Sequence, residues 1–178
     1  AVGDAVTITG TVTEFTPSSS PESLSITEIT AATTTVTSSG NALPTAILIG
    51  PDGLLPPTAN FEDDNFTSFD PLTDGLDFYE ALEGMRVTVQ SPVAIAPTDT
   101  SLGELWTAIP TNATGLSPDG PLTIDGPVGA VGFNNSIGGD YNPERIQIDT
   151  DAQLSGAITT PNVSAGTRLS DVTGILTY

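Results

Sequence analysis

Hydrophobic and polar residues alternate along several short stretches of the chain, which is the pattern of half-buried β-strands. The first stretch covers residues 6–12 (VTITGTV), and Val6, Ile8 and Val12 fall on the face that is expected to turn inward. Gly10 shares that face, where a glycine predicts a bend or a bulge of the kind that small barrels need. The other predicted strands are residues 24–30, 33–38, 85–90, 105–109, 145–149 and 166–178, whereas residues 46–49 form a short apolar segment before a loop.

One segment between these strands carries the signals of a short helix. Asp77 suits the N-cap, and Glu80 follows three residues later, which completes a capping box. Phe78 and Leu82 lie four positions apart and give the helix one apolar face. Gly84 stands where a left-handed C-terminal cap is expected. The sequence therefore predicts one short helix directly before the strand at 85–90.

Three strands, a short helix and two further strands follow one another in the order of an OB-fold, which is a five-stranded Greek-key barrel. We therefore expect an all-β protein with an OB-fold-like barrel at residues 1–110, in which the helix lies between strands three and four and closes one end. Residues 111–178 are expected to form a β-rich extension that begins a second repeat or packs on the barrel. The final strand, 166–178, either pairs with this body or leaves an open edge.

Composition and charge indicate the environment in which the protein works. Of the 178 residues, 37% are hydrophobic, which is too many for a disordered chain. The 22 acidic residues face only three arginines, and the net charge is −19. Such a surface suits secretion into a salty or calcium-rich medium, where counterions screen the repulsion. We therefore expect a secreted, extracellular protein. No apolar run is long enough to span a bilayer, so no membrane insertion is expected.

Three residue types are missing altogether, and their absence excludes several kinds of chemistry. Without histidine there is no Ser-His-Asp triad and no histidine-ligated zinc. Without lysine or cysteine there is no Walker phosphate loop, Schiff base or thiolate nucleophile. Paired carboxylates and carboxylate-bound hard cations remain, but nothing in the sequence sets two carboxylates across a cleft. We therefore expect that the chain alone is not an enzyme.

Several motifs of the chain resemble the accessory region of secreted bacterial nucleases. They are GDAVTITGTVTEF near the N-terminus, then TVTSSGNALPTAILIG, the helix–strand stretch DFYEALEGMRVTVQ, and GTRLSDVTGILTY near the C-terminus. In that family, OB-fold-like modules precede an endonuclease/exonuclease/phosphatase-type catalytic domain that relies on histidines. The resemblance implies a non-catalytic module that positions substrate or the nuclease catalytic domain of the parent chain. Since this chain has no histidine, that catalytic domain is absent from it.

The resemblance and the OB-fold both imply binding of single-stranded nucleic acid through a basic groove and stacking aromatic residues. The candidate residues are Arg86, on the polar side of its strand, with Trp106 and Tyr79 as stacking partners. Further aromatic candidates are Phe15 and Tyr141. The alternatives are an ion pair of Arg86 with Glu83 and a place for Trp106 in the barrel wall. Three arginines in a chain of charge −19 attract phosphates only weakly.

Acidic residues gather between positions 62 and 77, where Ca2+ is the candidate cofactor. The stretch DPLTDGLD has a glycine at its sixth place, as an EF-hand loop does. It departs from an EF-hand because Leu72 and Ala81 stand at the third and twelfth places. The candidate metal ligands are Asp70, Asp74, Asp77, Asp63 and Asp64, the last two in a run with Glu62. The alternative is a set of solvated acidic loops.

Two other functions fit the same features. Open strand edges favour a structural extracellular module that forms a homo-oligomer, as in a strand-exchange fibre or a surface layer. The acidic loops favour a calcium-dependent adhesion or glycan-binding module.

Overall fold

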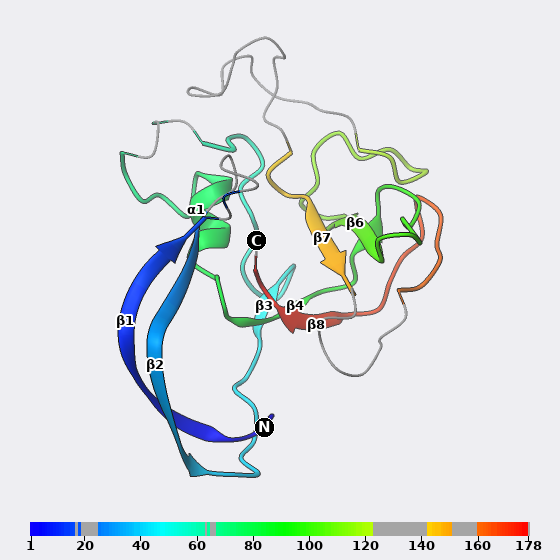
Figure 1. Ribbon diagram of the computed structural model, residues 1–178. Coiled ribbons are helices and arrows are strands. Elements are labelled where there is room, and N and C mark those ends of the chain that lie inside the picture. The colour runs from blue at the N-terminus through cyan, green and yellow to red at the C-terminus, as the bar shows by residue number, and fades with distance from the viewer. Residues whose placement is uncertain are drawn as a thin grey trace.

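The computed structural model describes residues 1–16, 18, 25–62, 64, 67–122, 142–150 and 160–177 (Figure 1). In this part of the chain, strands predominate and there is one short helix, which confirms the all-β class. The elements are β1 (Ala5–Phe15), β2 (Ile26–Ser38), β3 (Ile47–Ile49), α1 (Gly75–Glu80), β4 (Arg86–Val89), β5 (Val93–Ala94), β6 (Glu104–Ala108), β7 (Ile146–Asp149) and β8 (Val172–Ile175).

The described strands form three separate sheets, in the orders β1-β2, β3-β4-β8 and β5-β6-β7. They do not close into a barrel, so the five-stranded Greek-key barrel stays a prediction. Strands from the two predicted parts, 1–110 and 111–178, share sheets: β7 pairs with β6, and β8 pairs with β4. These pairings join the two parts into common sheets.

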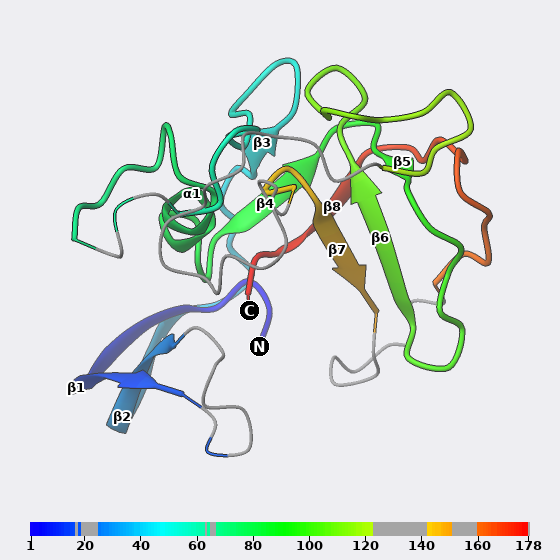
Figure 2. The same ribbon diagram turned by 90° about the horizontal axis from the view of Figure 1, so that it is seen from above.

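Strands β1 and β2 form a long, curved, two-stranded ribbon that lies along one side of the molecule, and we call this ribbon the arm (Figures 1 and 2). The residues predicted as two strands, 24–30 and 33–38, belong to the one strand β2. Ala31 lies between them with a φ of 51°, and the register shifts opposite Gly10. The bulge predicted at Gly10 is confirmed, whereas the separate third strand was wrong because Ala31 makes a bulge instead of a turn.

Strands β3 and β4 run parallel, with Ile47 opposite Val87 and Ile49 opposite Val89. Parallel neighbours cannot be joined by a tight turn and need a long crossover connection. Residues 50–85, which include α1, form that crossover. The acidic segment and the helix are therefore parts of one connection that leads from β3 back to the start of β4.

Helix α1 begins at Gly75 with Asp74 as its N-cap residue. The predicted N-cap at Asp77 was wrong, because Asp77 lies within the first helical turn. The predicted burial of Phe78 and Leu82 is confirmed, since they are 5% and 4% exposed, with Leu82 in the turn that follows α1. Among the described residues, no helix is long and apolar enough to cross a membrane.

The hydrophobic core draws on α1 and on both three-stranded sheets. Its buried side chains are Ile49, Phe78, Leu82, Val87, Val89, Ile109 and Ile146. The alternation along β4 explains its part, because Val87 and Val89 point inward while Arg86 and Thr88 stay partly exposed. The core therefore joins the part of the crossover that contains Phe78 and Leu82 to strand β4.

The last strand, β8, is shorter than the predicted 166–178 and has a partner. It pairs antiparallel with β4, with Arg86 opposite Ile175 and Val89 opposite Val172. Gly84, in a left-handed conformation with φ 69°, donates its N–H to the carbonyl of Leu176 at 2.9 Å. The final strand was expected either to pair with the rest of the protein or to leave an open edge, and the structure shows the pairing.

Candidate metal centre

The acidic crossover is pinned to the start of α1 by main-chain hydrogen bonds. The N–H groups of Gly75 and Leu76 donate to the carbonyls of Asn60 and Phe61, both at 3.1 Å. These N–H groups have no acceptor within the helix itself, so the crossover satisfies donors that a capping side chain would otherwise take. As a result, the residues that follow Phe61 lie against the N-terminus of α1.

This arrangement brings together three carboxylates from two places in the sequence. One oxygen of each of Glu62, Asp64 and Asp74 lies within 4.8 Å of the other two. Glu62 is 1% exposed and Asp74 is 0% exposed, while Asp64 is partly buried. We call these three residues the acidic cluster. A group of carboxylates at such distances is costly unless positive charge or hydrogen-bond donors compensate it.

Local hydrogen bonds hold Asp64 in its ionised form. The N–H of Asp64 donates to Oε1 of Glu62 at 2.8 Å, which orients the two residues toward each other. The carboxylate of Asp64 accepts the N–H of Thr67 at 2.8 Å. Hydrogen bonds from Ser68 and Thr67 lower the pKa of Asp64 to about 2, because they stabilise the charged carboxylate. Asp64 is therefore available as an anionic oxygen ligand at any ordinary pH.

The donor set of the acidic cluster consists of carboxylate oxygens, which are the ligands that hard cations such as Ca2+ and Mg2+ prefer. Metals that prefer thiolate or imidazole ligands would find neither, because the chain has no cysteine and no histidine. The three residues that could hold a metal ion are therefore Glu62, Asp64 and Asp74.

The predicted metal ligands separate into two groups. Asp64 and Asp74 belong to the acidic cluster. Asp70 and Asp77 instead form a turn beside it, in which the Asp77 carboxylate accepts the N–H of Asp70 and the Asp70 carbonyl accepts the N–H of Asp74 at 2.9 Å. Asp63 lies outside the described residues. Glu62, the third member of the cluster, was visible in the sequence only as part of an acidic run.

The residues predicted to contact nucleic acid lie in different environments. Arg86 donates through Nη1 to the carbonyl of Pro44 at 2.8 Å. The expected ion pair of Arg86 with Glu83 was wrong, because Glu83 accepts the main-chain N–H of Thr27 at 3.0 Å instead. Arg86 and Glu83 therefore each hold another segment of the chain through a hydrogen bond to its main chain.

Trp106 and Tyr79 both contact Arg145, which the sequence did not single out as a site residue. The guanidinium of Arg145 lies over the indole ring of Trp106, 5.3 Å from its centroid, and Trp106 is 38% exposed. The Tyr79 hydroxyl donates to the carbonyl of Arg145 at 3.3 Å. Burial and the nearby Glu144 carboxylate raise the pKa of the Tyr79 phenol, so it stays a hydrogen-bond donor.

The other two aromatic candidates lie away from this group or outside the described part. Phe15 is in the arm and about half exposed. Tyr141 lies outside the described residues.

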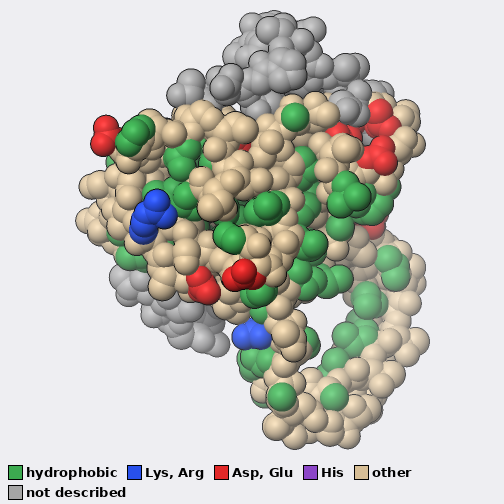
Figure 3. Space-filling model, turned by 180° about the vertical axis from the view of Figure 1, so that it is seen from behind, with side chains coloured by type: hydrophobic (Ala, Val, Ile, Leu, Met, Phe, Trp, Pro, Cys, Tyr) green, Lys and Arg blue, Asp and Glu red, His purple; other side chains and the backbone are tan. Residues whose placement is uncertain are grey.

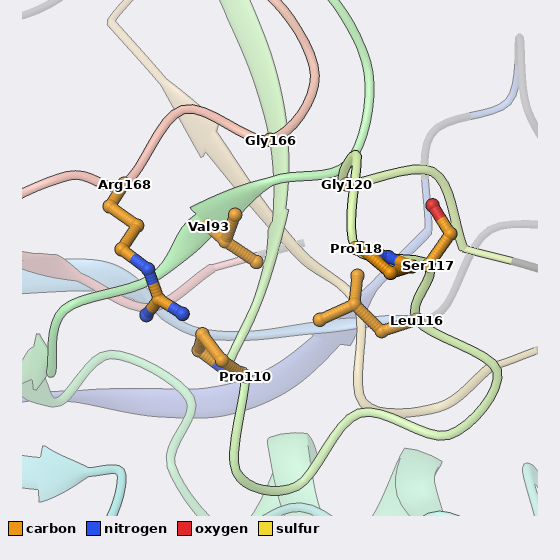
Figure 4. A pocket seen from close by; sticks show the side chains of 8 residues that line it. All are labelled: Val93, Pro110, Leu116, Ser117, Pro118, Gly120, Gly166 and Arg168. Atoms are coloured by element: carbon orange, nitrogen blue, oxygen red, sulfur yellow. The ribbon is translucent and has the colours of Figure 1, made fainter.

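A cavity of about 270 Å³ lies beside β5 and contains the third arginine (Figure 4). Its walls include Val93, Pro110 and Leu116, and the side chain of Arg168 points toward Pro110. One rim depends on glycine: a Cβ on Gly120 would lie 1.9 Å from the N atom of Gly166. Among the described residues that line it, Arg168 is the one charged side chain.

Comparison with known proteins identifies a family for most of the chain. No match to a curated protein or to a solved structure was found. Residues 48–178 match a family that is described as a domain of unknown function, DUF8508. The match includes the acidic crossover and every strand from β4 to β8, but it excludes the arm. Since it covers well over half of the chain, the protein belongs to the DUF8508 family.

Proposed function

We propose that this chain is a non-catalytic structural module of an extracellular protein, and that a calcium ion bound by the acidic cluster holds its crossover in place. One observation carries this proposal: the oxygens of Glu62, Asp64 and Asp74 lie within 4.8 Å of one another, and two of the three residues are almost fully buried. A divalent cation would neutralise most of the charge that these carboxylates bring together. The crossover leads into β4, so the ion would stabilise the central sheet as well.

Calcium fits this donor set better than magnesium does. Ca2+ accepts six to eight oxygens in irregular geometry, whereas Mg2+ requires a near-ideal octahedron and gives up its water reluctantly. The described residues of the crossover before α1 form turns and bends, and this irregular geometry suits the less demanding ion. Extracellular calcium modules commonly bind with dissociation constants of about 10⁻⁴–10⁻³ M, so a site of modest affinity would be filled in a calcium-rich medium.

Thermal unfolding in CaCl2 and in EGTA tests the proposal. At calcium concentrations about a hundredfold above the dissociation constant, we expect a stabilisation of about 2.7 kcal/mol. For a chain of this size, that corresponds to a rise in Tm of roughly 5–10 °C. Calorimetric titration should give one site per chain. A Tm that is the same in CaCl2 and in EGTA would contradict the proposal.

Two single-charge variants locate the ion. Asp64→Asn removes a cluster carboxylate, and we expect it to abolish most of the calcium-dependent rise in Tm. Asp70→Asn removes one negative charge from the neighbouring turn, so it controls for the general effect of charge. A loss of the calcium response in Asp70→Asn alone would favour the turn of Asp70 and Asp77 as the site.

The wider role that we propose is positioning. The chain lacks histidine, lysine and cysteine, and its motifs resemble the accessory region of secreted nucleases. A rigid module of this kind would hold a nuclease catalytic domain of the parent chain, or its substrate, at a set distance. Nuclease activity of the parent protein with and without this module is the measurement. If the parent protein cleaves free and immobilised DNA equally well with and without the module, the positioning role is contradicted.

A second candidate function is weak binding of single-stranded nucleic acid, and the group formed by Trp106, Arg145 and Tyr79 favours it. An exposed indole with a guanidinium over it can stack a base and meet a phosphate. The net charge of −19 opposes this binding, so it would require low salt or a divalent cation.

Trp106 is the only tryptophan, which makes its fluorescence a direct probe of this surface. Single-stranded oligonucleotides at low salt, added with and without CaCl2, should quench the fluorescence of Trp106 in the wild type. Arg145→Gln should weaken the quenching, whereas Arg168→Gln should leave it unchanged. Absence of quenching in every condition would leave the purely structural role.

The OB-fold-like barrel is retained as the alternative arrangement of the arm. Its support is the strand order, with α1 between β3 and β4 and with Phe78 and Leu82 packed inward. In a closed barrel, the arm would pair with strands of its own body. Slow amide exchange along β1 in a chain that remains monomeric would support this alternative.

A further inference from the structure

The arm has one apolar face and one threonine face. Alternate residues of a strand point to opposite faces, and directly paired residues share a face. Val6 pairs with Val36 and Val12 pairs with Ile29, so these side chains lie on one side of the ribbon together with Ile8. We call Val6, Ile8, Val12, Ile29 and Val36 the apolar stripe. The opposite face carries the threonine pairs Thr7–Thr35, Thr9–Thr33 and Thr11–Thr30.

A bulge keeps the stripe continuous along the ribbon. A Cβ on Gly10 would lie 2.5 Å from Cγ2 of Ile29 and 2.6 Å from the carbonyl oxygen of Thr30. Ile29 therefore reaches over the position where Gly10 has no side chain. Without the extra residue at Ala31, the second half of β2 would present its other side chains on this face.

The stripe is uncovered in the single chain. Its five side chains are 45–66% exposed, and neither β1 nor β2 contacts another described strand or α1. Figure 3 shows an opening between the arm and the body, with hydrophobic side chains along the inner side of the arm. A two-stranded ribbon is only marginally stable in water unless something packs on it. A contiguous exposed apolar patch marks an interaction surface.

The charge distribution indicates where a second copy of the chain can approach the first. Two copies of a chain with net charge −19 repel each other over most of their surfaces. The arm strands contain only two of the 22 acidic residues, Glu14 and Glu28, both near the same end of the ribbon. Glu14 accepts hydrogen bonds from the hydroxyls of Ser25 and Thr27 at 2.9 Å. The five residues of the apolar stripe carry no charge, so two arms can meet there with little repulsion.

We propose that the apolar stripe is a self-association surface, and that the stripe of a second copy of this chain covers it. Contact of the same patch on both copies gives a closed, two-fold dimer. The arm lies outside the residues that match the family, so this surface is separate from the family's shared body. The proposal does not depend on calcium.

The size of the arm sets the expected strength. Strands of 11 and 13 residues, at a rise of about 3.3 Å per residue, give a face roughly 40 Å long and about 10 Å wide. Its area of about 400 Å² is half of the roughly 800 Å² that each partner buries in a standard interface. We therefore expect a reversible dimer whose population rises between micromolar and about millimolar protein.

Sedimentation velocity over that concentration range, in EGTA and moderate salt, tests the proposal. The average mass of the wild type should rise toward that of a dimer. Val12→Asp places a charge within the stripe at a side chain that is 66% exposed, so the monomer tolerates it. We expect this variant to remain monomeric. Thr11→Asp adds the same charge on the threonine face and should associate as the wild type does.

A probe on the arm separates a partner copy from other occupants. The chain has no cysteine, so single cysteines accept a pyrene label without interference. Pyrene at Thr34→Cys, on the stripe side, should give excimer emission that grows with concentration, while pyrene at Thr33→Cys should give none. Unchanged Trp106 fluorescence would show that each variant keeps its folded body.

A wild type that stays monomeric at millimolar concentration would overturn the proposal. Slow amide exchange along the arm in that monomer would then show that its own body covers the stripe. Equal loss of association in Val12→Asp and Thr11→Asp would also overturn it, because the effect would not depend on the face.

Discussion

Glu83 accepts the main-chain N–H of Thr27 at 3.0 Å, so a carboxylate of the body fastens the arm near the start of β2. The other end of the ribbon is closed by the N–H of Asn41, which donates to the carbonyl of Gly3 at 2.8 Å. The first contact crosses from the turn after α1 to the arm, and it makes the position of the arm sensitive to one side chain.

Replacing Glu83 by Ala should loosen the arm without unfolding the body. Loss of this charge-assisted hydrogen bond at a partly exposed site is expected to cost about 1 kcal/mol, which raises amide exchange near Thr27 roughly fivefold. Hydrogen exchange followed by mass spectrometry measures the effect. Asp119→Asn removes one negative charge at an exposed position outside the arm, so equal exchange near Thr27 in the two variants would contradict the role of Glu83.

Gly75→Ala should destabilise the protein, although alanine is the better helix former. A Cβ at Gly75 would lie 2.4 Å from the Cβ of Pro143, which packs against the start of α1. Overpacking of this kind costs about 1–3 kcal/mol, which exceeds the gain of about 1 kcal/mol in helix propensity. Urea unfolding gives the difference. Gly174→Ala is the matched control, because nothing lies within 4 Å of the Cβ position there.

Leu82→Ala should lower the free energy of unfolding by about 2–5 kcal/mol, because Leu82 is buried in the core beside Phe78. Met85 is nearby in sequence but about half exposed, so Met85→Ala should change the free energy of unfolding by less than about 1 kcal/mol. Both values follow from chemical denaturation monitored by Trp106 fluorescence. Similar losses in the two variants would indicate that α1 does not pack as described.

Acid should remove a contribution of Asp64 to stability over a defined range. Hydrogen bonds lower its pKa from 3.8 to about 2, so the folded state favours the ionised form. This contribution is fully present above pH 3.8 and is lost as the pH falls toward 2. Asp64→Asn should lose less stability than the wild type between about pH 5 and about pH 2.5. Asp119→Asn, at an exposed loop position, should follow the wild type.

The elements that the sequence predicted well are those whose pattern is local. Alternation at 85–90 and 145–149 corresponds to β4 and β7 within a residue or two at each end. The apolar pair Phe78 and Leu82 predicted the buried face of α1, because a four-residue spacing puts two side chains on the same side of a helix.

The features that the sequence did not predict depend on contacts between distant residues. The parallel pairing of β3 with β4 leaves no mark on either strand, since Ile47 and Ile49 read the same in any sheet. The N-cap fell at Asp74 instead of Asp77 because the carbonyls of Asn60 and Phe61 take the first helical N–H groups.

The acidic cluster could be predicted only in part for the same reason. Asp64 and Asp74 stand in two separate acidic stretches, and their proximity depends on the folding of the crossover against α1. Glu62 lies in the same run as Asp64, which was the one local signal for the third residue. The group of Trp106, Arg145 and Tyr79 likewise combines β6, the residue before β7, and α1.

The central position of β4 also affects how the protein is made. Its neighbours come from far away on both sides of the sequence: Ile47 pairs with Val87 across the acidic crossover, and Val89 pairs with Val172 near the other end. During synthesis, β4 leaves the ribosome with only one of its two partners already present. The β3–β4 pair must therefore wait, with one edge unpaired, until Val172–Ile175 has emerged. In that interval, the negative charge of the chain would oppose pairing between neighbouring nascent chains.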